Sequence, residues 1–378
     1  MIKPLEGVVV LDFTQFLSGP SASLRLADLG AEVIKIEQPE QGDLCRRLYV
    51  SNCDILGESS LFQAINRNKK SVTLNLKNAE DKKIIEALIT RADVVINNFR
   101  PTVMKKLGLD YAKVQVLNPR VIYGEITGYG CDGPWSHKPG QDLLLQALSG
   151  LTWLSGNDSD GPVPMGVAVA DILAGAQLVQ GILAALINQD SNNSSTLVQV
   201  SMLEAILDFQ FEPLTLYYQD QEQPRRNKIN GAHALVGGAY GLYKTLDGYI
   251  CISMGGIPQL GQILGCEPLL AFTDASQWFA QRDDIKLLLK THLVNQTTQY
   301  WLSLLEPADI WCSDVLNWED LLAHDGFKAL DMLQTVSMSD GSQYETTRCP
   351  IRIDGEFLLA EQGAPKLGEH NAIYKSNR

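Results

Sequence analysis

Short apolar runs alternate with amphipathic segments through the first half of the chain. β-branched runs at Gly7–Phe13 and Glu32–Glu37 predict buried strands on either side of a helix at Ser21–Leu29. Such a strand–helix–strand unit is the usual start of a parallel sheet with helices on its faces. The same alternation predicts further strands at 71–76, 93–97, 121–126 and 197–200, and helices at 79–91, 103–107, 111–117 and 141–148. We therefore expect an α/β fold.

A loop, a single carboxylate and a long helix follow one another in Gly161–Ala185. Pro162 and Pro164 disfavour regular structure at the start of this stretch, and apolar residues then recur at helical spacing from Ile172 to Leu186. Asp171 stands where the N-cap is expected, directly after an apolar run. The carboxylate is predicted to cap the helix, to act as a nucleophile in a partly dry site, or to do both.

The pattern changes in the second half of the chain. Met202–Tyr218 predicts one amphipathic helix, and Gln219–Asn230 a charged linker at a domain boundary. Two apolar runs joined by Asp247-Gly248 predict a hairpin at 239–254. Helices are expected from Ile257, Ala275, Asp284 and Thr298, and a return to strands and coil at 327–336, at 348–353 and in the tail to Arg378.

Charge and composition exclude several classes of function. The chain has 378 residues and a net charge of −13, so nucleic acid and anionic membranes are poor partners. Every long apolar stretch is interrupted by Gly, Asp or Gln, and the N-terminus lacks a signal-peptide pattern. Seven scattered cysteines without a CxxC pair predict reduced thiols and a cytoplasmic protein. The five histidines are dispersed, and no metal site is expected.

One region is locally basic against this acidic background. Such a run is either a solvated face or a site for a phosphorylated ligand. The residues are Arg67, Lys69, Lys70, Lys77, Arg100, Lys105 and Lys106. A polar loop at 43–48 carries two further arginines, Arg46 and Arg47.

A series of short motifs, in order along nearly the whole chain, resembles the family III CoA-transferases, the carnitine/bile-acid-inducible (CaiB/BaiF) or formyl-CoA transferase-like family. The matching pieces are Pro4–Gly7 with Leu11–Phe13, Gly19-Pro20, Leu29–Glu37, Gly42-Asp43, Asn66–Ser71, Asn98–Pro101, Leu117–Arg120, Gly128–Gly130, Gly133-Pro134, Asp142, Asp171, the hairpin at Tyr243–Gly248 and Pro365–His370.

The resemblance implies an interlocked-ring homodimer with active sites between the large domain of one subunit and the small domain of the other. It implies a Rossmann-like large domain built from both chain ends and a small α/β domain. The corresponding ranges are 1–200 for the N-terminal part of the large domain, 201–230 for a linker helix and linker, 231–322 for the small domain, and 323–378 for the C-terminal return to the large domain.

The resemblance also implies a catalytic role for Asp171, with an acyl-CoA and a carboxylic acid as substrates and no tightly bound cofactor. A carboxylate can attack a thioester to give an aspartyl anhydride and then an aspartyl-CoA thioester. Gly255-Gly256 is interpreted as a source of backbone donors for the oxyanion, a mobile flap or a simple turn.

By the same resemblance, a set of residues is expected to line the path of CoA and the acyl group. The set is Gln15, Leu17, Ser18, Gln38, Leu74, Asn75, Lys77, Asn98, Phe99, Arg100, Lys106, Lys138, Gln141, Asp142, Gly255 and Gly256. Leu17, Gln38 and Leu48 replace a glutamine, an arginine and a tryptophan of the formyl-CoA type, which argues against formate and oxalate as substrates.

Three alternatives remain. An α-methylacyl-CoA racemase of the same fold is disfavoured because Gln141 stands where such enzymes carry a histidine, and glutamine cannot exchange protons near neutral pH. A nicotinamide-dependent oxidoreductase is disfavoured because Gly-x-Gly-x-x-Gly is missing after the first strand. A non-catalytic acyl-CoA binder would keep its affinity after Asp171→Ala.

Overall fold

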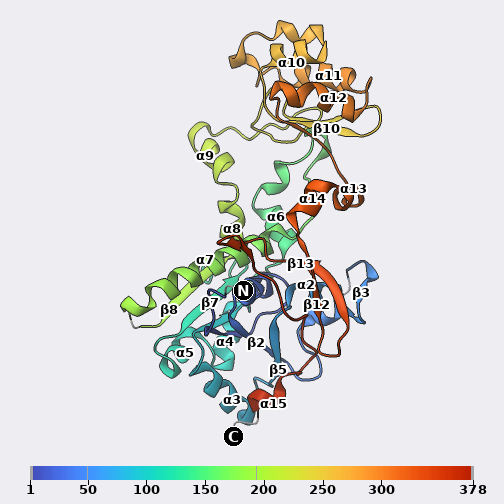
Figure 1. Cartoon of the computed structure of the whole chain (residues 1–378). Helices are drawn as coiled ribbons and strands as arrows, with labels where there is room; N and C mark the ends of the chain where they lie inside the picture. The colour runs from blue at the N-terminus through green and yellow to red at the C-terminus, as the bar shows by residue number, and fades with distance from the viewer. Residues whose placement is uncertain (1–2, 49, 193, 376–378) are drawn as a thin grey trace. The chain divides into compact units, whose positions relative to one another are not determined.

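The computed structural model describes residues 3–48, 50–192 and 194–375 and divides the chain into two compact units. The large unit consists of residues 1–145, 168–209 and 329–378, and the small unit of residues 146–167 and 210–328. The blue start and the red end of the chain therefore both belong to the large unit (Figure 1).

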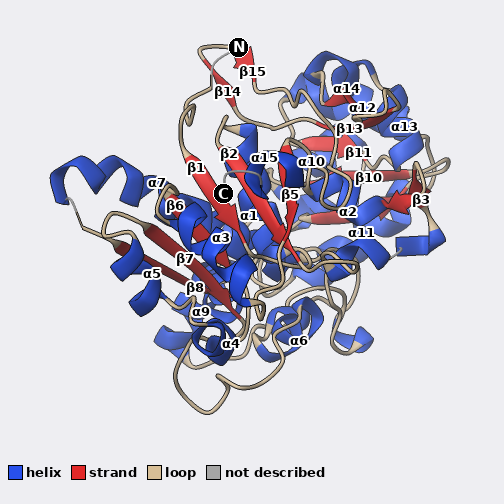
Figure 2. Cartoon of the chain, turned by 90° about the horizontal axis from the view of Figure 1, so that it is seen from below, coloured by secondary structure: helices blue, strands red, loops and turns tan. Residues whose placement is uncertain are grey.

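A parallel sheet of six strands, in the order β5-β2-β1-β6-β7-β8, forms the centre of the large unit (Figure 2). This confirms the predicted α/β class. The chain passes from β1 outward to β5, returns to the other side of β1 as β6, and continues to β8. The point where the strand order reverses therefore lies between β1 and β6, where Leu11 pairs with Val95. The bounds are β1 Val9–Asp12, β2 Glu32–Glu37, β5 Lys69–Thr73, β6 Val94–Asn97, β7 Ile122–Thr127 and β8 Thr196–Ser201.

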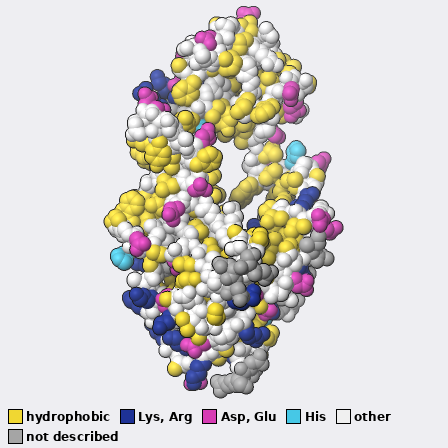
Figure 3. Space-filling view, turned by 90° about the vertical axis from the view of Figure 1, so that its left-hand side faces the viewer, with side chains coloured by type: hydrophobic (Ala, Val, Ile, Leu, Met, Phe, Trp, Pro, Cys, Tyr) yellow, Lys and Arg dark blue, Asp and Glu magenta, His cyan; other side chains and the backbone are white. Residues whose placement is uncertain are grey.

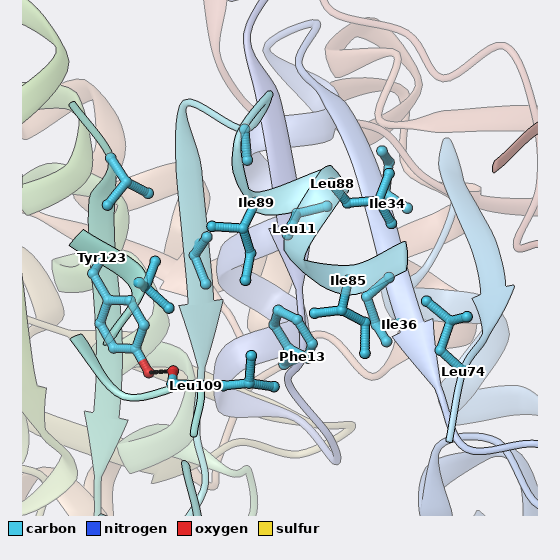
Figure 4. Close-up of a cluster of buried hydrophobic side chains, with 14 of the residues drawn as sticks. Leu11, Phe13, Ile34, Ile36, Leu74, Ile85, Leu88, Ile89, Leu109 and Tyr123 are labelled. Carbon is cyan, nitrogen blue, oxygen red and sulfur yellow. Dashed lines mark hydrogen bonds between the residues drawn. The ribbon is translucent and has the colours of Figure 1, made fainter. Parts of the chain in front are cut away.

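Three helices cover one face of this sheet. They are α3 (Ala79–Ile89), α4 (Pro101–Leu107) and α5 (Tyr111–Leu117). Side chains of α3 and of the strands interdigitate in the cluster shown in Figure 4. Tyr123 is completely buried there, and its hydroxyl donates to Leu109 O at 2.8 Å.

The opposite face carries α1 (Ser18–Asp28) and α7 (Val169–Asn192). A Cβ placed on Gly124 of β7 would lie 3.1 Å from Leu178 Cδ1, so α7 packs tightly against that strand. The stretch Val169–Gln189 is long and apolar enough to cross a membrane by length and composition, which the sequence pattern had not indicated. Core helices of soluble proteins pass the same test, and α7 contacts α1, β7, β8 and α8 (Met202–Asp208).

The C-terminal part of the chain completes the large unit. Tyr344 donates to Gln63 O at 3.0 Å and thereby ties the C-terminal β-ribbon to α2. Residues 327–330 were predicted to start a return to strand and coil, but they are helical. They belong to α14 (Asp325–Leu330), and the strand β12 begins only at Leu333. The elements are α2 Ser60–Ile65, β3 Asp54–Ile55, β4 Glu58–Ser59, β12 Leu333–Ser337, β13 Gln343–Thr347, β14 Arg352–Ile353, β15 Glu356–Phe357 and α15 Asn371–Lys375.

The small unit contains an antiparallel sheet of three strands in the order β11-β10-β9. The predicted hairpin is confirmed: β9 and β10 pair with Lys244 opposite Tyr249. Three helices pack on this sheet around a separate apolar core. The predicted helix from Ala275 is only a 3-10 turn, Ala275–Gln277. The elements are β9 Gly241–Lys244, β10 Tyr249–Ile252, β11 Cys312–Asp314, α10 Ile257–Leu264, α11 Arg282–Leu293, α12 Thr298–Leu305 and α13 Trp318–Ala323.

The segment predicted as one helix at 202–218 forms two, α8 and α9 (Phe211–Asp220). Pro213 lacks a backbone N–H and is tolerated only in the first turn of a helix, so α9 has to start anew just before it. The two units divide at this break, between Phe209 and Gln210. A further helix, α6 (Asp142–Leu148), starts in the large unit and ends in the small one.

Candidate active site

Polar residues that follow β1 and β6 meet at the point where the strand order reverses. The backbone N–H of Gln15 donates to Asn98 Oδ1 at 2.8 Å, and Asn98 Nδ2 donates back to Gln15 O at 2.7 Å. The same Nδ2 donates to Ser18 Oγ at 3.2 Å. Asn98 thus joins the loop after β6 to the first turn of α1. Ligands of open α/β sheets bind at this kind of position.

Buried charges hold the loop between β1 and α1. Asp12 Oδ1 accepts from the backbone N–H of Thr14 at 2.8 Å, and Lys35 Nζ donates to Thr14 O at 2.8 Å. Asp43, which forms an ion pair with Lys35, accepts from Phe16 N at 3.2 Å. Phe16 has a φ of 63° and a side chain that is 48% exposed. A left-handed conformation in a non-glycine residue persists only where the surroundings impose it, and it is concentrated at functional sites.

The sequence led us to expect Asp171 at the N-cap of α7. In the structure it is the third residue of that helix and does not cap it. The helix begins at Val169, and Ala168, which precedes it, has no side-chain acceptor. The cap comes from α6: Asp142 Oδ1 accepts from the N–H of Ala170 at 2.7 Å and from that of Asp171 at 3.3 Å. These are the donors that an N-cap side chain would satisfy. The carboxylate of Asp171 is consequently available for other contacts.

Burial raises the pKa of Asp171 to about 6, and the negative charge of Asp142 acts in the same direction. Hydrogen bonding from the hydroxyl and from the backbone N–H of Ser18 opposes these effects. Ser18 is the first residue of α1, so the carboxylate of Asp171 is close to the N-terminus of a second helix. Near neutral pH the group is ionised and more basic than an ordinary aspartate, as a nucleophile requires.

The sequence model of CoA-transferase family III matches residues 5–371. The chain is a family III CoA-transferase. It is 30% identical to the succinate–glutarate CoA-transferase of Agrobacterium fabrum, over 98% of this chain and 94% of the relative. It is 31% identical to the formyl-CoA:oxalate CoA-transferase of Streptomyces avermitilis, over 98% of this chain and 94% of the relative. The crystal structure of a CAIB/BAIF family protein from Brucella suis superposes with a TM-score of 0.85 at 28% identity, covering 100% of this chain and 99% of that one.

Of the residues expected to contact substrate in this CoA-transferase, Gln15, Ser18, Asn98 and Asp142 lie together with Asp171. Three others are exposed after the strands of the same sheet: Gln38 after β2, and Asn75 and Lys77 after β5. The first turn beyond β5 is ordered by Asn75, whose Oδ1 accepts from Lys77 N at 3.0 Å.

Further expected contact residues lie on α4 and around α6. Arg100 and Lys106 are exposed at the start and in the last turn of α4, and Gln141 is exposed next to the start of α6. Lys138 is exposed, with its Nζ 5.7 Å from the centre of the Trp135 ring. These cationic groups are therefore accessible to an anionic ligand.

Three apolar residues of the expected set contribute to hydrophobic cores. Leu17 packs against a core formed by Leu24, Cys45 and Phe62. Leu74 is 1% exposed in the main core, and the ring of Phe99 packs against the same core. Leu17 and Phe99 are half-buried, and only Leu74 is withdrawn completely from solvent.

Gly255 and Gly256 belong to the small unit. They follow β10, and Gly256 is the N-cap residue of α10. The carbonyl of Gly256 accepts from Leu260 N at 2.9 Å, which fixes it within the helix start.

Most of the first basic run is occupied by internal ion pairs. Arg67 Nη2 lies 2.7 Å from Asp28 Oδ2, and Lys69 Nζ lies 3.3 Å from Asp12 Oδ2. Both basic side chains are buried, so neither the solvated face nor the ligand site predicted for them is correct. Each compensates a buried carboxylate of the large unit.

The segment 43–48, predicted as a polar loop that carries Arg46 and Arg47, is partly buried: Arg47 is exposed, but Arg46 is not. It contains the 3-10 helix Leu44–Arg47, and Arg46 is buried. The Arg46 guanidinium donates to both carboxylate oxygens of Glu37, at 2.7 and 2.8 Å. This bidentate pair anchors the segment on the end of β2.

Sequence reasoning missed the buried charges beneath the site. One signal was present: Lys35 lies between Ile34 and Ile36 in a run assigned to a buried strand, so its charge needed a buried partner. Phe16 left no such signal, because nothing in its neighbours indicates a positive φ. Within residues 3–48, 50–192 and 194–375, no group of three or more His, Cys, Asp or Glu side chains could hold a metal ion.

Proposed function

We propose that this CoA-transferase moves CoA from an acyl-CoA to a carboxylic acid through covalent intermediates on Asp171. The carboxylate attacks the thioester carbonyl, and the C–S bond breaks to give an aspartyl–acyl anhydride and CoA thiolate. The thiolate then attacks the aspartyl carbonyl of the anhydride, which releases the first acid as its carboxylate and leaves CoA as a thioester on Asp171. The acceptor carboxylate repeats these steps in reverse and departs as the new acyl-CoA.

The observation that carries this proposal is the state of the Asp171 carboxylate. Because Asp142 caps α7, the Asp171 side chain is not needed for that purpose. Its pKa is raised to about 6, which combines ionisation near pH 7 with increased basicity. Its place beside the loops after β1 and β6 is where this class of sheet binds ligands.

The proposed substrates are short acyl-CoA thioesters and short carboxylic acids. Relatives are named as succinate–glutarate and formyl-CoA:oxalate CoA-transferases, and both names describe short acids. Leu17, Gln38 and Leu48 depart from the formyl-CoA type, so we favour succinate and glutarate over formate and oxalate.

We also propose that the working form is an interlocked homodimer, with Gly255 and Gly256 bordering the site. Exposed apolar side chains on the large unit support a partner subunit: Leu143 and Leu144 are 52% and 42% exposed, and Ile172 and Ile187 are 51% and 84% exposed. Yellow patches of apolar side chains are visible on the face in Figure 3. Light scattering should give twice the chain mass of 41.6 kDa.

The deciding experiment traps the intermediate. The enzyme is incubated with succinyl-CoA, glutaryl-CoA, acetyl-CoA or formyl-CoA and quenched with hydroxylamine, which converts an aspartyl thioester or anhydride into a hydroxamate. Peptide mass spectrometry should place the hydroxamate on Asp171. Asp171→Asn should abolish both the adduct and acyl exchange, whereas Asp208→Asn, a matched change of an exposed carboxylate on α8, should retain both.

Three results would contradict the proposal. An adduct on another residue, or none with any thioester of the panel, would exclude Asp171 as the carrier of CoA. Deuterium uptake at the α-carbon of a 2-methylacyl-CoA, without acyl exchange, would instead indicate the racemase reaction. Equal CoA affinity in the unmodified protein and in Asp171→Ala, with no turnover in the unmodified protein, would indicate a non-catalytic binding protein.

A further inference from the structure

Helices α1 and α7 are in close contact at Gly175. A Cβ built on this buried glycine would lie 2.3 Å from Ser21 Oγ and 2.7 Å from Ser18 O. Non-bonded atoms do not come so close, so only a residue without a side chain permits this contact. The two helices would have to separate locally to admit even a methyl group.

Ser18 of α1 takes part in this contact and also acts on the Asp171 carboxylate. Gly175 follows Asp171 by four residues, so both lie on one face of α7, one turn apart. The carbonyl of Ser18 lies where a Cβ on residue 175 would be, 2.7 Å away, while the hydroxyl and the N–H of Ser18 lower the pKa of the Asp171 carboxylate. The spacing of the helices at Gly175 therefore sets the distance across which Ser18 reaches Asp171.

The first turn of α1 cannot easily move to make room. Ser21 Oγ donates to Ser18 O at 2.8 Å, and Ser21 N donates to Leu17 O at 2.8 Å. Asn98 Nδ2 holds Ser18 Oγ from the loop after β6 at 3.2 Å. A side chain at position 175 would consequently displace the start of α7, which carries Asp171.

We propose that Gly175 is a positioning residue: by lacking a side chain, it brings α7 close enough to α1 for Ser18 to hold the reactive carboxylate of Asp171. The inference rests on the proposed role of Asp171 as the nucleophile. It assigns to Gly175 no contact with substrate. A shift of about 1 Å in a reacting group is enough to cost about a hundredfold in rate.

The variant Gly175→Ala tests this, with Gly181→Ala as its matched control. Gly181 lies on the same helix, and its Cβ would be 2.5 Å from Val198 Cγ1 of β8, away from Ser18. Both variants overpack α7 and should lower the melting temperature to a similar extent. Only Gly175→Ala should lower kcat by about ten- to a hundredfold with little change in the KM for acyl-CoA.

A titration separates positioning from simple destabilisation. The groups that act on the Asp171 carboxylate are Asp142 of α6 and Ser18 of α1. Moving Ser18 away from Asp171 weakens the influence that lowers the pKa and leaves burial and Asp142 unopposed, so the acidic limb of the kcat/KM profile should move to higher pH in Gly175→Ala and stay in place in Gly181→Ala. Ser18→Ala should move the limb in the same direction, and combining it with Gly175→Ala should add little.

A readout without catalysis keeps this inference distinct from the mechanism. In protein labelled with carbon-13 at the aspartate carboxyl carbon, the Asp171 signal, assigned by its loss in Asp171→Asn, should titrate at higher pH in Gly175→Ala. If no adduct ever forms on Asp171 but this titration shifts, the positioning role stands and the mechanism fails. If Gly175→Ala does not fold, adding Ser21→Ala removes the nearer contact and should give a folded protein with an intermediate shift. Identical pH profiles and carboxyl titrations in the Gly175 and Gly181 variants would overturn the proposal.

Discussion

Asp142 Oδ1 accepts a hydrogen bond from the backbone N–H of Asp171 at 3.3 Å. The Asp142 carboxylate therefore holds the backbone of Asp171 in place, and its negative charge also contributes to the raised pKa of the Asp171 side chain. The hydrogen bond orients the first turn of α7. The same negative charge disfavours a second one on Asp171. The two effects can be separated by substitution because one depends on an acceptor oxygen and the other on charge.

Replacing Asp142 with asparagine keeps an oxygen that can accept from the start of α7 but removes the charge. Burial raises the pKa of Asp171 to about 6, and the Asp142 charge acts in the same direction, so removing that charge should move the acidic limb of kcat/KM to lower pH. The rate at the optimum should fall several-fold, because a less basic carboxylate is a weaker nucleophile. The pH profile and the equilibrium unfolding of both Asp142→Asn and Asp142→Ala should be measured.

Asp142→Ala removes the cap as well as the charge. We expect it to lower the free energy of unfolding by about 1 kcal/mol, whereas the asparagine variant should remain close to the unmodified protein. An acidic limb that stays in place in Asp142→Asn would contradict the electrostatic part of this account.

Asn98→Ala should reduce activity far more than its effect on stability suggests. The side chain makes three hydrogen bonds, to Gln15 N, Gln15 O and Ser18 Oγ. Losing them should cost about 1–3 kcal/mol of unfolding free energy, and kcat should fall by more than about tenfold because the loop beside Asp171 is released.

Asn118 provides the matched control. Its side chain also makes three hydrogen bonds, to Ile89 O, Ala92 O and Arg120 N, at the opposite end of the sheet. Asn118→Ala should therefore destabilise the protein to a similar degree, measured by urea unfolding, and leave kcat unchanged. Equal losses of activity in the two variants would show that Asn98 acts through stability alone.

The ion pair between Lys69 and Asp12 should be a major determinant of stability. Both side chains are fully buried, and Lys69 Nζ also donates to Pro20 O at 2.9 Å. Lys69→Ala leaves a buried carboxylate with one partner fewer and should cost about 3–5 kcal/mol. The exposed pair of Lys83 and Glu80 should lose no more than about 0.5 kcal/mol in Lys83→Ala.

Replacing both partners of the Lys69–Asp12 pair should destabilise the protein less than replacing Lys69 alone. Replacing both partners, as in Asp12→Asn with Lys69→Met, should recover much of the loss, because no unpaired charge then remains buried. A double variant as unstable as Lys69→Ala would show that the other hydrogen bonds of these residues, and not their charges, dominate. Denaturant titration measures all of these values.

His370 should make the docking of the C-terminal segment sensitive to acid. Its Nδ1 accepts from Ser71 N on the edge strand β5 at 3.2 Å, which requires the neutral ring. Burial lowers the pKa of His370 below its ordinary value, and Lys70 acts in the same direction against Glu369. The unfolded chain therefore binds the proton more readily, so this contribution is present above about pH 6.5 and is lost as the pH falls through the depressed pKa.

The measurement compares the unmodified protein with His370→Leu, which cannot titrate. The difference between their free energies of unfolding should shrink as the pH is lowered from 7.5 to 5. The protection of the amides of residues 69–73 against hydrogen exchange, corrected for the intrinsic rate at each pH, should fall over the same interval in the unmodified protein only. A difference that does not vary with pH would exclude the histidine as the sensitive group.

Local pattern was sufficient for much of the fold. The strand Glu32–Glu37 was predicted with the bounds that the structure has, and the hairpin around Asp247-Gly248 was also correct. These elements depend on neighbours in sequence: alternation or continuity of apolar residues, and a turn dipeptide. The break before α9 was not predicted, because the helical spacing of apolar residues continues across it. Pro213 was the available signal for that break.

The sequence alone singled out Asp171 and, by resemblance, the polar residues after β1 and β6. Their roles could not be read there, because the partners lie far apart along the chain: Asp142 caps a helix that begins 27 residues later, and Asn98 bonds to Gln15 across 83 residues. Whether a lysine such as Lys69 faces solvent or a buried carboxylate likewise depends on which strand lies beside it. Residue type and spacing govern local conformation, but burial, capping and charge coupling arise only when distant segments pack, and these set the chemistry of Asp171.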